Sequence, residues 1–174
     1  MELRLLKLFK IVAICLLLVN IGCGPSGQEK APWPASVQFS GLNKNEIEAI
    51  TSSLETLSTN VGTTLFSFED QKEQFQITVT KMKPDNGNTS RAGFATYDGV
   101  FCTVELNEIV LGEAYNAYFE PVLWHEVGHC SGMTHNEKSG ELMYYIASPK
   151  EFYRADAFSN FYSSLLKFTS IQIN

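Results

Sequence analysis

Residues 125–135 read HEVGHCSGMTH and hold all three histidines of the 174-residue chain. On an α-helix, His125 and His129 lie four positions apart and therefore share one face. Gly132 is the residue type that lets a chain leave a helix with a positive φ, and such a turn would bring His135 back toward the other two. The stretch predicts a helix that ends in a turn and gathers three imidazoles.

Three imidazoles with an open fourth position are the ligand set of a catalytic zinc ion rather than of a closed structural one. Glu126 follows the first histidine, and its carboxylate can act as a general base beside the metal. Bound zinc lowers the pKa of water and polarises a carbonyl, so the pattern predicts amide hydrolysis. The alternative, ordinary core or surface histidines, is disfavoured because five residues match one motif.

HEVGHCSGMTH resembles the zinc-binding consensus of the metzincin metallopeptidases. Eight residues after His135, Met143 stands in GELMYY, which is similar to the Met-turn beneath the metal in that family and is closest to its matrixin branch. The resemblance implies one zinc ion bound by His125, His129 and His135, a base and proton shuttle at Glu126, the turn at Gly132, and Met143 under the metal. Only residues 125–145 carry these specific motifs.

The chain departs from the matrixin pattern after its third histidine. Asn136 stands where matrixins usually have serine, and Tyr145 stands where they commonly have proline. Some metzincin branches have a tyrosine at the latter position that helps to stabilise the oxyanion, so Tyr145 is a candidate helper; a tyrosine buried in the cleft wall is the alternative. No further histidine is present to bind the second, structural zinc ion of many matrixins.

The rest of the chain predicts an α+β domain of metzincin, zincin-like type over residues 36–174, with about five strands in a mixed twisted sheet. Strands are expected around Val37–Phe39, at 64–68, around Phe75–Val79, at 92–97 and at 100–106, where apolar residues alternate or are β-branched. In the resembled family an edge strand runs antiparallel to the bound substrate, and the segment 92–97 is the candidate here.

Three helices are expected beside the sheet. A capping box at Asn43 and Glu46 predicts a helix over 44–58. The active-site helix is expected from Pro121, a residue suited to the first helical position, to Cys130. A C-terminal helix is expected over 149–167, because proline follows a serine cap and an apolar stripe follows at helical spacing.

Residues 1–22 have the pattern of an export signal. Three basic side chains precede 11–21, IVAICLLLVNI, which is short for a spanning helix of about 20 residues. Gly22-Cys23 resembles the lipobox of bacterial lipoproteins, although Asn20 replaces its usual leucine. We therefore expect acylation of Cys23 at the bacterial cell envelope, followed by a Pro/Gly-rich tether over 23–35. Ordinary signal cleavage and secretion is the alternative.

Two cysteines remain in the exported domain and suggest one disulfide. In the resembled fold the zinc helix packs close to the sheet, so Cys102 on a predicted strand could meet Cys130 at the end of that helix. The bond would close a loop of about 28 residues. Two buried free thiols are the alternative.

Composition and charge narrow the range of partners. The chain is 44% hydrophobic and 18% charged, as expected for one folded domain. Its net charge is −6, and removal of residues 1–22 leaves 10 basic and 18 acidic residues, a net charge of −8. We expect a monomer that binds no nucleic acid and favours basic or neutral substrates.

These patterns predict an exported, lipid-anchored zinc metalloendopeptidase that acts on proteins or peptides. A second class of function is a non-catalytic, zinc-containing module that captures peptides at the cell surface. Glu126 favours the enzyme, because a binding module needs no general base. A third candidate substrate is a non-protein amide, such as a cell-wall peptide, since the motif does not specify what flanks the amide bond.

Overall fold

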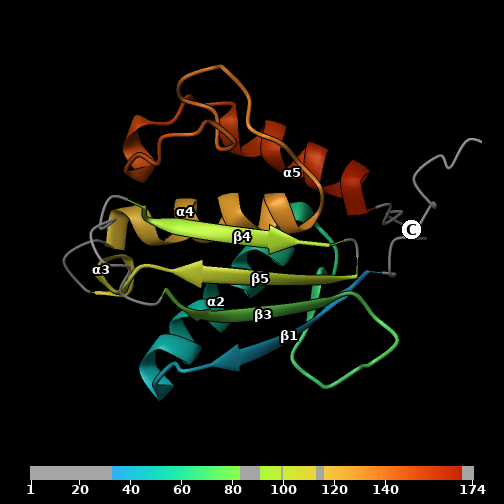
Figure 1. Cartoon of the computed structure of the whole chain (residues 1–174). Helices are drawn as coiled ribbons and strands as arrows, with labels where there is room; N and C mark the ends of the chain where they lie inside the picture. The colour runs from blue at the N-terminus through green and yellow to red at the C-terminus, as the bar shows by residue number, and fades with distance from the viewer. Residues whose placement is uncertain (1–32, 83–90, 99, 113–115, 170–174) are drawn as a thin grey trace, which may run out of the picture.

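A computed structural model of the chain describes residues 33–82, 91–98, 100–112 and 116–169. The expected signal segment, Cys23 and the tether up to residue 32 lie outside these ranges, as does the predicted turn at 83–90. The described residues form an α+β arrangement with a five-stranded mixed sheet, which confirms the coarse fold class (Figure 1).

The sheet has the strand order β2-β1-β3-β5-β4. Its members are β1 (Ala35–Ser40), β2 (Phe66–Ser67), β3 (Gln76–Lys81), β4 (Gly93–Tyr97) and β5 (Phe101–Leu106). Every neighbouring pair is parallel except β4 and β5, which are antiparallel. Strand β4 therefore forms one edge of the sheet. Strand β2 is shorter than the predicted 64–68, because only Phe66 and Ser67 pair with β1.

One face of the sheet carries the core and the other faces outward. In the register of β3 and β5, Ile77 lies opposite Cys102 and Val79 opposite Val104, and all four side chains are buried. Thr78 and its neighbours on the opposite face are more exposed. This alternation has the two-residue period of a half-buried sheet, so a single layer of helices covers it.

Helix α2 (Lys44–Val61) has the expected capping box. The side chain of Asn43 accepts a hydrogen bond from the Glu46 backbone N–H, and the Glu46 carboxylate accepts one from the Asn43 N–H. The predicted end at residue 58 is wrong by three residues. The apolar face continues to Val61, which is buried, and the helix ends where Gly62 takes a φ of 81°.

Helix α4 (Asn116–Cys130) carries the HEVGH motif. It begins at Asn116 rather than at the predicted Pro121, which lies inside the helix and is buried. Proline at this point removes one backbone hydrogen bond close to the helix start, and packing of the helix outweighs that loss. The short helix α3 (Glu108–Leu111) was not predicted; the side chain of Asn107 caps it.

The closing helix begins later than predicted. The segment after Pro149 forms a short 3₁₀ helix, η2 (Lys150–Phe152), and α5 then runs over Ala157–Thr169. The predicted continuous helix fails because the Arg154 N–H donates to the Gly140 carbonyl, and this holds the segment to a distant loop. The local signals at Ser148 and Pro149 start only this single turn, and its N-cap, Pro149, makes no side-chain capping hydrogen bond.

Figure 1 shows α2 and α4 side by side on one face of the sheet, with α4 behind β4 and α5 next to it. Because α4 packs on β4 and β5, its histidine-bearing face lies beside the edge strand. Within the described ranges, no helix has the combination of length and hydropathy that crossing a bilayer requires.

Candidate functional site

Helix α4 and the turn after it bring the three histidines of the chain together. The Nε2 atoms of His125, His129 and His135 lie 3.0–3.1 Å from one another. Gly132 makes the expected turn with a φ of 96°, and the Met133 N–H donates to the Gly128 carbonyl across it. This cluster could hold a metal ion.

Backbone carbonyls orient two of the three rings. Nδ1 of His125 lies 2.7 Å from the Leu142 carbonyl oxygen, and Nδ1 of His129 lies 2.8 Å from that of Met133. Because a carbonyl only accepts hydrogen bonds, Nδ1 carries the proton in each neutral ring and Nε2 presents a lone pair. The lone pairs of these rings therefore point at each other, an arrangement that a cation stabilises.

The donor set also fits the size of a zinc ion. Zinc–nitrogen bonds of about 2.0–2.1 Å in a tetrahedral site separate the nitrogens by about 3.3 Å. The spacing of 3.0–3.1 Å among the Nε2 atoms is close to that value. Burial lowers the pKa of His125 to about 4 and also lowers that of His129, so both rings are neutral at neutral pH, as metal ligands must be.

Glu126 lies beside the histidine cluster, between α4 and the edge strand. Its side chain is only 6% exposed. A Cβ atom on Gly93 of β4 would lie 2.8 Å from Oε1 of Glu126, so glycine at this position leaves room for the carboxylate against the strand. Burial raises the pKa of Glu126 to about 7. A carboxylate with such a pKa is suited to both accepting and releasing a proton.

The segment that follows His135 returns beneath the cluster. The Asn136 N–H donates to the Met143 carbonyl at 2.9 Å, and the Tyr144 N–H donates to the Glu141 carbonyl at 3.0 Å, which closes a tight turn. Met143 is buried, and its sulfur lies so close to Gly128 that a Cβ there would be 2.5 Å from it. The turn thus packs against α4 at Gly128.

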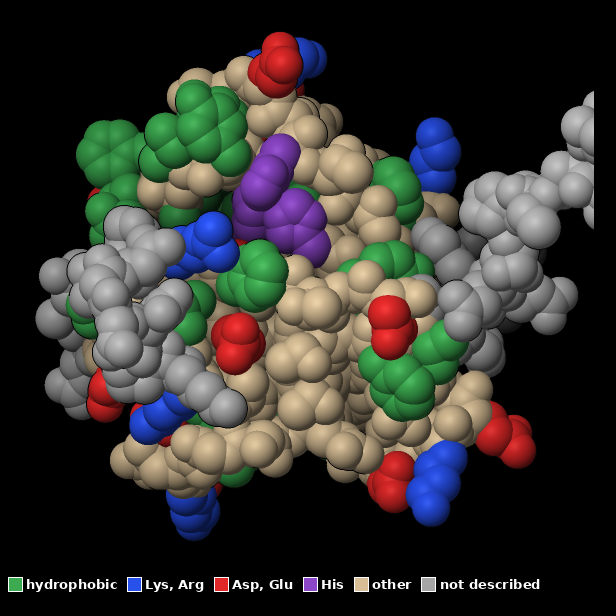
Figure 2. Space-filling model, viewed as in Figure 1, with side chains coloured by type: hydrophobic (Ala, Val, Ile, Leu, Met, Phe, Trp, Pro, Cys, Tyr) green, Lys and Arg blue, Asp and Glu red, His purple; other side chains and the backbone are tan. Residues whose placement is uncertain are grey.

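A cleft of about 950 Å³ opens over the cluster, and His125, His129, His135 and Glu126 all line it. Figure 2 shows histidine side chains at the surface with hydrophobic side chains around them. Tyr145 also lines the cleft and is 62% exposed, so the alternative of a buried wall tyrosine is wrong. Strand β4 contributes Gly93 and Phe94 to the opposite side.

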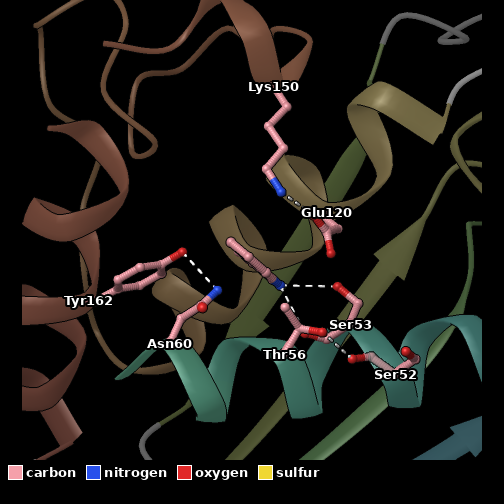
Figure 3. Close-up of polar contacts among 8 residues, drawn as sticks. Ser52, Ser53, Thr56, Asn60, Glu120, Lys150 and Tyr162 are labelled. Atoms are coloured by element: carbon pink, nitrogen blue, oxygen red, sulfur yellow. Dashed lines mark hydrogen bonds and ion pairs between the residues drawn. The ribbon is translucent and has the colours of Figure 1, made fainter. Parts of the chain in front are cut away.

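A buried tryptophan fixes α4 against its neighbours. Nε1 of Trp124 donates to Oγ and to the carbonyl of Ser53 on α2, at 3.1 and 3.3 Å. On the other side, Nζ of Lys150 lies 5.7 Å from the Trp124 ring and 2.8 Å from the Glu120 carboxylate (Figure 3). Trp124 immediately precedes His125, so its hydrogen bonds to Ser53 hold the first histidine in place.

Figure 3 also shows Asn60 of α2 and Tyr162 of α5 pointing toward each other, with 3.1 Å between Nδ2 and the hydroxyl oxygen. This contact connects the outer helices around α4. Neither these contacts nor the role of Gly93 was predicted from the sequence. The glycine inside a predicted strand was the available signal, because such residues mark the close approach of another group.

A disulfide joins Cys102 of β5 to Cys130 at the end of α4, with the Cα atoms 5.4 Å apart. This is the expected pair, and free thiols at these positions are excluded. Both residues are buried. Because Cys130 directly follows His129, the bond ties the end of the ligand helix to the sheet.

Comparison with models of known protein families gives no match to the chain, and comparison with curated proteins also gives none.

Proposed function

We propose that the protein is a zinc-dependent metalloendopeptidase of metzincin type. The observation that carries the proposal is the convergence of three imidazole nitrogens beside a buried carboxylate at an edge strand. Three histidine ligands leave a fourth position for water or substrate, whereas structural zinc sites are closed by four protein ligands. The resemblance of residues 125–145 to the metzincin motifs supports the same assignment.

His125, His129 and His135 would hold the ion. Zinc bound there supplies a Lewis acid that acidifies water and polarises the scissile carbonyl. Glu126 accepts a proton from the attacking water and later delivers it to the leaving amine nitrogen. Its burial and its position in the cleft support this role. Tyr145, which is exposed in the same cleft, would donate a hydrogen bond from its hydroxyl group to the developing oxyanion.

Strand β4 would bind the substrate. It pairs with β5 on one side, and no strand among the described residues pairs with its other side. An extended peptide that adds to this edge gains backbone hydrogen bonds regardless of its sequence. Gly93 and Glu126 would then lie next to the peptide bond that is cut. We further propose export and anchoring through Cys23, from the pattern of residues 1–23.

A non-catalytic module that captures peptides is the second candidate. The same edge strand and apolar cleft would serve it, but it would not need a buried carboxylate beside the histidine cluster. Because burial of an unpartnered carboxyl group is unfavourable, its presence here favours the enzyme.

Incubation of the purified, zinc-loaded protein with a mixed peptide library distinguishes the metalloendopeptidase from the peptide-binding module. We expect cleavage products by mass spectrometry, and we expect a zinc chelator to abolish them. Cleavage that returns when zinc is added back shows that the chelator acts by removing zinc and not by a direct effect on the protein. A folded, zinc-loaded protein that enriches peptides without cutting them would instead establish the binding module.

A further inference from the structure

Among the described residues that line the cleft, Arg91 is the one lysine or arginine. Arg91 lies two residues before β4, and its backbone is held in place. Its carbonyl accepts a hydrogen bond from the Asn107 side chain at 3.0 Å, and the next carbonyl, of Ala92, accepts one from the Asn107 N–H at 2.9 Å. The backbone therefore fixes where this arginine enters the cleft.

The guanidinium group of Arg91 packs on an exposed aromatic ring. Its Cζ lies 5.3 Å from the ring centroid of Phe94, which is 42% exposed. No described carboxylate forms an ion pair with Arg91; even Glu105, which lies opposite Phe94 in the sheet register, is not within pairing distance. A guanidinium group that rests on an aromatic face still presents its N–H donors at its edge, where their spacing matches the two oxygens of a carboxylate.

The distance along the strand places this group relative to the reaction. Gly93 lies against Glu126, and Arg91 precedes Gly93 by two residues, or about 7 Å of extended chain. A peptide that extends along β4 would therefore place a residue opposite Arg91 about two positions from the bond next to Glu126. A carboxylate opposite Arg91 would contact the guanidinium group directly, at a separation well below the Debye length of about 8 Å at physiological ionic strength, so salt would weaken the attraction only in part.

We propose that Arg91, supported by Phe94, selects substrates that carry a carboxylate about two residues from the scissile bond. The inference rests on the proposed function. The expected preference for acidic substrates is opposite to the preference for basic or neutral substrates that the net charge predicts. The two differ because Arg91 acts locally within the cleft. The carboxylate can be an Asp or Glu side chain, or the free C-terminus of a short peptide.

The test compares cleavage of peptides that differ at one position at a time. We expect the zinc-loaded protein to cleave peptides with Asp or Glu two residues from the cut about fivefold faster than those with Asn or Gln. Arg91→Gln should remove this preference, Arg91→Glu should reverse it toward Lys, and Arg91→Lys should retain part of it. Lys72→Gln is the matched control, because it removes one exposed positive charge away from the cleft.

Two further experiments are needed. The first distinguishes a side-chain carboxylate from a C-terminal one, and the second distinguishes failure of this inference from failure of the proposed function. Short peptides with a free or an amidated C-terminus at the same position show whether the terminal carboxylate suffices. Binding of fluorescent acidic and amide peptides to the zinc-loaded Glu126→Gln variant tests recognition without turnover. Absence of cleavage, together with Arg91-dependent binding of acidic peptides, would refute the enzyme but support the recognition of a carboxylate by Arg91. Equal cleavage and equal binding of both peptides, unchanged by Arg91→Gln, would overturn the inference.

Discussion

Glu126→Gln is expected to lower the rate of peptide hydrolysis by about 10²–10⁴-fold, the usual contribution of a general acid–base group. Glutamine fills nearly the same volume against Gly93 but cannot accept the proton of the attacking water. The three histidines are unchanged, so zinc should still bind. Initial rates on a peptide found in the library, with zinc content measured on the same samples, give the comparison.

Glu120→Gln is the matched control for this variant. Glu120 also lies on α4, and its carboxylate pairs with Lys150 outside the cleft. We expect it to retain activity within a few-fold of the unchanged protein. A Glu126→Gln variant that remained as active as this control would show that another group moves the proton.

Replacement of both cysteines, Cys102→Ala with Cys130→Ala, is expected to reduce the free energy of unfolding by about 3.6 kcal/mol. The disulfide spans 28 residues, and cutting it restores conformational entropy to the unfolded chain. Urea denaturation of the unchanged and doubly substituted proteins, both with zinc removed, measures the difference.

Reduction provides the control for the loss of side-chain packing. The reduced, unchanged protein lacks the cross-link but keeps both buried sulfur atoms. It should unfold at nearly the same urea concentration as the double variant, because both proteins have lost the cross-link that restricts the unfolded chain. A double variant as stable as the oxidised protein would mean that the cross-link does not limit the unfolded state, contrary to the loop-entropy account.

The candidate metal-binding and acid–base residues were predictable from sequence because they belong to one helix and the turn after it. The positions of His125 and His129 follow from helical periodicity, and Gly132 has the positive φ that its place at the helix end predicts. The disulfide partners needed the resemblance to a fold in which helix and sheet are adjacent. Sequence alone could pair the two cysteines only by count.

The supporting contacts could not be predicted, because they depend on how distant elements pack. Gly93 meets Glu126 only when β4 lies beside α4, and Trp124 meets Ser53 only when α4 lies beside α2. The exposure of Tyr145 likewise depends on where the loop after Met143 returns. The same limit applies to helix ends, since the signal at Pro149 was overridden by the bond between Arg154 and Gly140.

The binding of one zinc ion by the three histidines is the central claim, and metal content after extensive dialysis tests it most directly. We predict one zinc ion per chain in the unchanged protein, and near-complete loss in His129→Ala, because two remaining ligands bind the ion far more weakly. Circular dichroism confirms that the variant remains folded. A folded, unchanged protein that retains no zinc at micromolar free metal, or an equal zinc content in both proteins, would contradict the account.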